Sequence, residues 1–268
     1  MIKPMATVIL PTFNHGSTLR LAIESALGQT VPVEVFIIGD GVPEQNKLLI
    51  HEIVSGDSRV KFFDYPKHVS RGEPYRDHAL KFAKGEIVCY LCDRDLWFPE
   101  HVERLAVLLK KADFAHSFPF HILPGNEFKS FPVDLRFSIF RQLMLKKFNH
   151  VPFSSVAHTL DFYHQLNNGW DTTPRGQATD WHFFKKFLSK DDCRCVSGTD
   201  PTVLTFPSPP RLTWTEEQRV EELTLWRTRI GTADRRKELV LAILKAGIIE
   251  RDMYLGNVYA KLYPEYLP

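Results

Sequence analysis

Two carboxylates follow an apolar run in the first half of the chain. Asp93 and Asp95 lie one residue apart, directly after the apolar residues 87–91. Carboxylate oxygens are ligands that Mg²⁺ and Mn²⁺ prefer, and proteins often share these ions with the phosphates of a substrate. The pattern therefore indicates a nucleoside-diphosphate site with a divalent cation, although Asp-x-Asp after a strand also fits a turn or a helix cap.

The elements that position these carboxylates can be predicted from the alternation of apolar runs and amphipathic stretches. The expected strands are residues 7–10, 33–38, 60–63 and 87–91, and the expected helices after them are 18–27, 45–54, 75–83 and 99–109. This order predicts an α/β fold with a mainly parallel sheet covered by helices on both faces. In such sheets ligands bind beyond the carboxyl ends of the strands.

Other polar side chains also stand where the expected strands end. Pro11, Thr12 and Asn14 follow the first strand, and Asp40 lies between two glycines after the second. Their backbone amides and side chains could hold a base or a phosphate, whereas Asn14 could equally cap the next helix. Arg71, Arg76 and Lys84 lie between the third and fourth strands, and two of them could reach the same crevice, although a solvated side chain is the commoner role of an arginine.

Asp180 stands where a loop containing Gly and Pro enters an amphipathic stretch, residues 179–188. Its carboxylate could stabilise the positive end of that helix. It could also face the crevice as a general base. The residues alone leave both interpretations open.

The last part of the chain has a different pattern. The proline-rich residues 200–210 predict an extended strand and a linker, and helical periodicity follows in residues 216–230, 233–246 and 250–262. We therefore expect a domain of residues 1–210 and a small helical extension of residues 211–268. The basic residues of this extension could form a peripheral membrane contact, a homodimer face or a solvated surface.

Composition limits the class of protein. The chain has 268 residues, a formal net charge of +2 and four cysteines. The charge gives no reason to expect nucleic acid as a partner, and the cysteine content argues against a disulfide scaffold. Pro11 interrupts the apolar N-terminal run, so no signal segment or membrane span is expected there. We expect a cytoplasmic protein that could also make peripheral contact with the inner face of the membrane.

Five segments in the same order resemble the family-2 glycosyltransferases of GT-A fold over roughly residues 5–206. The matching segments are residues 8–14, 22–30, 35–41, 76–86 and 95–100. The resemblance implies an inverting transferase that moves a sugar from a nucleotide-diphosphate donor, expected to be a UDP-sugar, to a hydroxyl of a glycan or lipid-linked acceptor. A non-catalytic nucleotide-sugar or glycan-binding protein on the same fold is the alternative.

The resemblance also implies roles for individual residues. Those expected to bind the nucleotide sugar are Pro11, Thr12, Asn14, Asp40, Arg76, Asp93 and Arg94. Among them, Asp40 would bind the uracil edge and Arg76 would lie beside the base. Asp180 would remove the proton of the acceptor hydroxyl.

The chain departs from the family at the Asp-x-Asp segment. Members commonly carry Leu-Asp-x-Asp-Asp, which in register puts the usual carboxylate pair at Cys92 and Arg94. Either Asp93 and Asp95 hold Mn²⁺ or Mg²⁺ instead, or the Arg94 guanidinium supplies the positive charge against the diphosphate. We expect the metal, because Asp95 can still act as an oxygen ligand.

Overall fold

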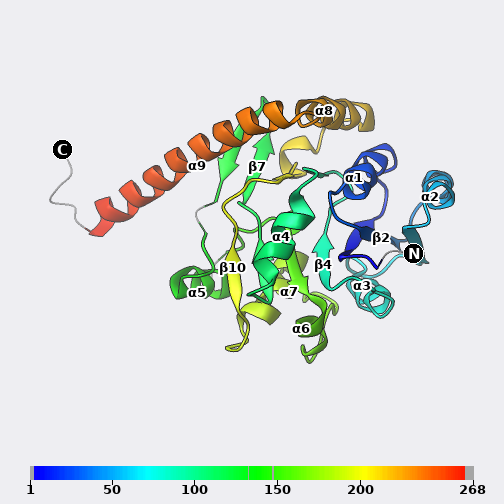
Figure 1. Cartoon of the computed structure of the whole chain (residues 1–268), viewed down its shortest axis with the longest axis horizontal. Coiled ribbons are helices and arrows are strands. Elements are labelled where there is room, and N and C mark those ends of the chain that lie inside the picture. Colours follow the sequence, from blue (N-terminus) through cyan, green and yellow to red (C-terminus); the bar gives the residue numbers. More distant parts are fainter. Residues whose placement is uncertain (1–2, 132, 147, 263–268) are drawn as a thin grey trace.

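The computed structural model describes residues 3–131, 133–146 and 148–262. Within them, the core is a seven-stranded sheet in the order β10-β6-β9-β4-β1-β2-β3 (Figure 1). Its strands are β1 (Ala6–Thr12), β2 (Val33–Asp40), β3 (Val60–Tyr65), β4 (Ile87–Tyr90), β6 (Phe114–His116), β9 (Val156–Thr159) and β10 (Cys195–Ser197). Among these strands only β9 is antiparallel to its neighbours, β4 and β6, so the sheet is mostly parallel as predicted.

Helices cover both faces of this sheet because successive side chains of its strands point to opposite sides. In β1, Val8 and Leu10 pack with one group of helices, while Ile9 packs with the other. The first group is α1 (Ser17–Leu27), α2 (Glu44–Gly56) and α4 (His101–Leu109). The second group is α3 (Glu73–Leu80), α5 (Ser138–Lys146), α6 (Leu160–His164) and α7 (Thr179–Leu188). The result is the predicted α/β layering.

Shorter elements complete the carboxyl edge of the sheet. They are β5 (Leu96–Trp97), paired antiparallel with β11 (Val203–Leu204), the hairpin of β7 (Phe120–Leu123) and β8 (Glu127–Ser130), and the 3-10 turns η1 (Phe153–Ser155) and η2 (Pro209–Arg211). The expected strand in residues 200–210 is therefore confined to two residues. The helix expected over residues 138–147 is α5, and Lys147 lies outside the described residues.

The C-terminal helices are α8 (Glu216–Arg229) and α9 (Ala233–Leu262). The prediction of two helices at 233–246 and 250–262 is wrong, because α9 is continuous through Gly247. A Cβ atom on Gly247 would lie 2.7 Å from a ring carbon of Phe118. The glycine therefore allows α9 to cross Phe118 closely without ending the helix.

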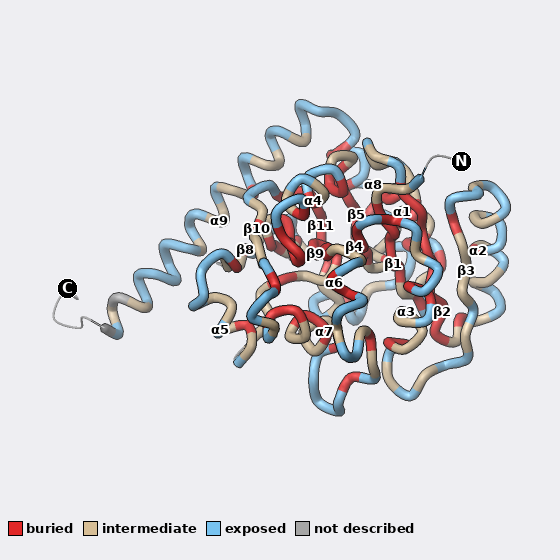
Figure 2. The backbone as a smooth tube through the Cα atoms, turned by 60° about the horizontal axis from the view of Figure 1, so that its bottom comes forward, coloured by how far each residue is buried: buried red, intermediate tan, exposed pale blue. Residues whose placement is uncertain are grey.

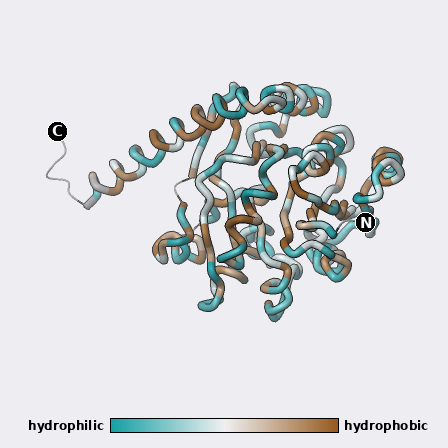
Figure 3. Tube along the Cα trace, in the orientation of Figure 1, coloured by the Kyte–Doolittle hydropathy of each residue, from teal (hydrophilic) through white to brown (hydrophobic). Residues whose placement is uncertain are grey.

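The beginning of the helical extension packs on the sheet domain. Leu223, Trp226 and Ile243 are buried in one cluster with Phe120 and Phe206. Farther along, α9 extends away from the rest of the molecule, and its side chains are mostly exposed (Figures 1 and 2). Apolar residues are distributed along this exposed part (Figure 3). No helix in the described ranges has the length and apolar character needed to cross a membrane.

We predict that α8 unfolds together with the sheet domain. Trp226 is 1% exposed, so Trp226→Ala should lower the free energy of unfolding by about 3–5 kcal/mol through lost burial and a cavity. Urea unfolding followed by circular dichroism should show one transition shifted to lower urea. Leu225→Ala, at a residue 48% exposed, is the control and should change little. A separate early transition would show that residues 211–268 unfold independently.

Candidate functional site

A pocket of about 660 Å³ opens at the carboxyl ends of β1, β2 and β4. This volume lies within the usual range of small-molecule sites. The structure places every site residue predicted from the sequence in its lining: Pro11, Thr12, Asn14, Asp40, Arg76, Asp93, Arg94, Asp95 and Asp180. Residues 205–209, expected to be a linker, also line it.

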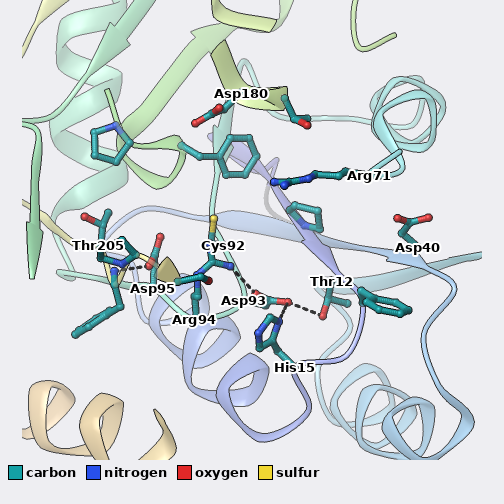
Figure 4. A pocket seen from close by; sticks show the side chains of 18 of the residues that line it. Thr12, His15, Asp40, Arg71, Cys92, Asp93, Arg94, Asp95, Asp180 and Thr205 are labelled. Atoms are coloured by element: carbon teal, nitrogen blue, oxygen red, sulfur yellow. Dashed lines mark hydrogen bonds and ion pairs between the residues drawn. The ribbon is translucent and has the colours of Figure 1, made fainter. Parts of the chain in front are cut away.

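Asp93 lies in the lining of this pocket beside Thr12, His15 and Arg94 (Figure 4). Its Oδ2 atom accepts a hydrogen bond of 2.8 Å from the Thr12 hydroxyl and lies 3.2 Å from His15 Nδ1. Its Oδ1 atom lies 3.6 Å from Arg94 Nη1. Burial by itself raises the pKa of Asp93, but His15, Arg94 and Thr12 outweigh burial and lower it. Asp93 is therefore an ionised carboxylate.

Asp95 is fixed by hydrogen bonds from two distant segments. Its Oδ1 atom accepts from the Phe206 backbone N–H at 2.9 Å, and its Oδ2 atom accepts from the Ser154 hydroxyl. Ser154 Oγ also accepts from the Cys92 N–H at 2.9 Å. Burial raises the pKa of Asp95. This carboxylate holds the 92–95 loop in place.

Arg94 and Cys92 differ in charge. Burial by itself lowers the pKa of Arg94, but the carboxylates of Asp95 and Asp93 raise it, so the guanidinium is charged. Its Nε atom is buried and has no hydrogen-bond partner among the described residues. Burial raises the pKa of Cys92 to about 12, so its thiol is neutral at physiological pH.

The donor chemistry of this loop fits a divalent cation poorly. Asp95 uses both oxygens as hydrogen-bond acceptors, and Asp93 uses one of them while the other faces a guanidinium. A neutral thiol is a poor ligand for Mg²⁺ or Mn²⁺. Within the described ranges, no group of three His, Cys, Asp or Glu side chains could hold a metal. The expected ion on Asp93 and Asp95 therefore does not fit the bonding of these two side chains.

Asp40 lies at the end of β2 beside a cationic side chain. Its Oδ1 atom accepts a 2.6 Å hydrogen bond from the His68 N–H, and its Oδ2 atom pairs with Lys67. Lys67 also lies over the Phe13 ring, 5.0 Å from its centroid. Gly41 has a φ of +73°, and a Cβ there would meet the Lys67 backbone, so glycine allows the two loops to approach.

Arg76 lies deeper than expected for a base-contacting residue. It is 5% exposed, donates a 2.9 Å hydrogen bond to the Arg71 carbonyl and stacks 4.6 Å from the Trp170 ring centroid. Burial lowers its pKa. Arg76 therefore also supports the loop that presents Arg71 to the pocket.

Asp180 lies in the first turn of α7 and faces the pocket on the same side as Arg71 (Figure 4). Its Oδ1 atom accepts from the Trp181 N–H at 2.8 Å, and its Oδ2 atom accepts from Asn149 at 3.1 Å. Burial raises the pKa of Asp180, while the Trp181 N–H and the charges of Arg71 and Arg76 oppose this shift. A carboxylate with a raised pKa at a pocket wall is suited to accept a proton.

Glu73 was not predicted from the sequence, yet it joins the loop that carries Arg71 to the segment that leads into α7. It is fully buried and accepts hydrogen bonds from the Ser70 hydroxyl at 2.8 Å, the Arg71 N–H at 3.0 Å and the Thr173 N–H at 3.3 Å. Burial by itself raises the pKa of Glu73, but the hydrogen bonds outweigh it and lower the pKa to about 2. In the sequence it resembles an ordinary acidic residue in a first helical turn. Four other residues of the site were also not predicted from the sequence: His15, Lys67, Ser154 and Phe206.

We predict that Glu73→Gln lowers the free energy of unfolding. The difference between the ordinary pKa of 4.5 and about 2 corresponds to about 3 kcal/mol. Because the folded-state pKa is depressed, this stabilisation is present above pH 4.5 and is lost as the pH falls toward 2. Urea unfolding across this range should show the wild type approaching the variant. Glu52→Gln, at a side chain 69% exposed, is the control. A difference that is independent of pH would contradict the prediction.

Comparisons with known proteins identify the family of this chain. Residues 7–167 match the family model described as Glycosyl transferase family 2. The chain is 29% identical over 118 residues to the GalNAc(5)-diNAcBac-PP-undecaprenol beta-1,3-glucosyltransferase of Campylobacter jejuni, covering 43% of this chain and 37% of that protein. It is 27% identical over 110 residues to the UDP-Glc:alpha-D-GlcNAc-diphosphoundecaprenol beta-1,3-glucosyltransferase WfgD of Escherichia coli, covering 40% and 42%. The chain spans less than half the length of each of these two relatives.

Solved structures show the same fold. The crystal structure of S. aureus TarS 1–349 in complex with UDP-GlcNAc matches with a TM-score of 0.59 and 16% identity, covering 75% of this chain and 58% of that one. The mannosyltransferase PcManGT from Pyrobaculum calidifontis, in complex with GDP-Man and Mn²⁺, matches with a TM-score of 0.56 and 14% identity, covering 98% and 82%. Both likenesses concern the arrangement of the backbone.

Proposed function

Because the chain belongs to glycosyl transferase family 2, we propose that it transfers a sugar from a UDP-sugar to a hydroxyl group of a saccharide, with inversion at the anomeric carbon. The observation that carries this proposal is the position of Asp180. Its carboxylate faces the same pocket as the ends of β1, β2 and β4, and burial raises its pKa. A proton acceptor and a nucleotide-sized site therefore share one cavity.

The reaction is a single displacement. The acceptor oxygen forms a bond to the anomeric carbon while the bond from that carbon to the diphosphate breaks. Asp180 takes the proton of the hydroxyl, and the electron pair of the broken bond leaves with the diphosphate. Attack opposite to the leaving group inverts the configuration at that carbon.

The donor subsite lies at the ends of β1 and β2. We assign the uridine to the side of the pocket formed by Pro11, Thr12, Asn14 and Asp40, because carboxylate and backbone groups there can pair with a base edge. The Asp40 oxygen that pairs with the half-exposed Lys67 side chain could accept from a base N–H if that side chain moved. Two similar proteins support a UDP-sugar as the donor. The name of the Escherichia coli relative gives UDP-Glc, and TarS was solved in complex with UDP-GlcNAc.

The acceptor is proposed from the relatives. Two of them are named for saccharides linked to undecaprenol through a diphosphate, so we propose a lipid-linked saccharide for this protein as well. Such an acceptor would bring a cytoplasmic enzyme to the inner face of the membrane. The exposed apolar side chains Ile248, Ile249 and Met253 of α9 are compatible with a peripheral membrane contact or a homodimer.

We predict that Asp180→Asn lowers the rate of sugar transfer by about 10²–10⁴-fold, because the amide cannot accept the proton. UDP binding should persist, since the donor subsite is unchanged. UDP release from UDP-glucose and UDP-GlcNAc, with and without saccharide acceptors, measures the rate, and calorimetry measures binding. Asp161→Asn, on the exposed surface of α6, is the control. Binding of UDP without turnover of any donor by the wild type would instead identify a non-catalytic binding protein.

A further inference from the structure

The 92–95 loop presents a guanidinium to the pocket where a diphosphate-bound metal ion was expected. We propose that Arg94 itself binds the diphosphate of the donor and stabilises the leaving group, so that this protein works without a divalent cation. This inference rests on the proposed function, because it assumes a nucleoside-diphosphate donor.

The first argument is the bonding of the two carboxylates. Asp95 is 4% exposed, and each of its oxygens accepts a hydrogen bond, one from Phe206 and one from Ser154. Asp93 is equally buried and has one oxygen bound by Thr12 at 2.8 Å. A metal ion on these carboxylates would have to displace hydrogen bonds that hold the loop together.

The second argument is that Arg94 keeps its donors available. Its side chain is 28% exposed and lines the pocket. Its closest carboxylate contact is 3.6 Å, from Nη1 to Asp93 Oδ1, which is longer than a direct hydrogen bond. Its Nε atom has no partner within the described part of the chain but is buried, so the donors that could meet a phosphate are the Nη groups. A guanidinium with unused N–H groups can bind two phosphate oxygens at once.

The third argument is the charge across the pocket. Arg71 enters from the opposite wall, below Asp180 in the view of Figure 4. A diphosphate between Arg94 and Arg71 would therefore meet a positive charge from each side. When the bond to the anomeric carbon breaks, the electron pair adds a negative charge to the leaving diphosphate, and a fixed guanidinium stabilises that charge without reorganisation.

The test compares UDP with uridine, which lacks the diphosphate, by calorimetry on the full chain. After exhaustive chelation with EDTA, the wild type should still bind UDP more tightly than uridine, and added MnCl₂ should not change the ratio. Arg94→Met should weaken UDP binding by about 10–100-fold and leave uridine binding unchanged, as expected for the loss of charge-assisted hydrogen bonds. Arg104→Met, at a side chain 62% exposed and outside the pocket lining, is the matched control.

Two results would overturn the inference and leave the proposed function standing. One is a preference of the wild type for UDP over uridine that disappears on chelation and returns with Mn²⁺. The other is an Arg94→Met protein that binds UDP like the wild type. If UDP does not bind under any of these conditions, the proposed function fails, and the inference fails with it.

Discussion

Asp95 is the constraint on which the site depends. It lies just beyond β4, and its two oxygens join this loop to η1 through Ser154 and to the segment after β11 through Phe206. A buried carboxylate that satisfies both oxygens in this way strongly resists rearrangement, because each broken bond would leave a buried polar group without a partner. The turn at 92–95 is therefore rigid. Its middle residues, Asp93 and Arg94, are therefore held at the pocket by their backbone.

Glu73 does for the opposite wall what Asp95 does for the loop. It joins the residues before α3 to the segment that enters α7, through Ser70, Arg71 and Thr173. Arg71 and the start of α7, which carries Asp180, are therefore held by one buried carboxylate. Both walls of the pocket thus depend on an acidic side chain that has no assigned part in the reaction. Preorganisation of this kind fixes the charges before a substrate arrives.

The sequence predicts the half of the sheet in which each strand is followed along the chain by a helix that covers the sheet. Strands β1 to β4 have apolar runs and are followed by amphipathic helices, so their ends, and the polar residues there, could be found from spacing alone. Glu73 and Phe206 could not, because their roles arise from contacts about 100 residues away, such as the pair of Phe206 and Asp95 at a separation of 111. Gly247 misled the prediction because its low helix propensity suggested a break, whereas α9 continues through it and the missing side chain leaves room for Phe118.

The two departures from the family pattern, Cys92 and Arg94, are explained best together. In the family register, positions 92 and 94 would each carry a carboxylate. Here they carry a neutral thiol and a guanidinium, and Asp93 lies beside the guanidinium at 3.6 Å. A carboxylate at position 92 would lie beside Arg94 and compete with a diphosphate for its N–H groups. The neutral Cys92 therefore spares Arg94 a further carboxylate neighbour besides Asp93 and leaves more of its N–H groups to a diphosphate.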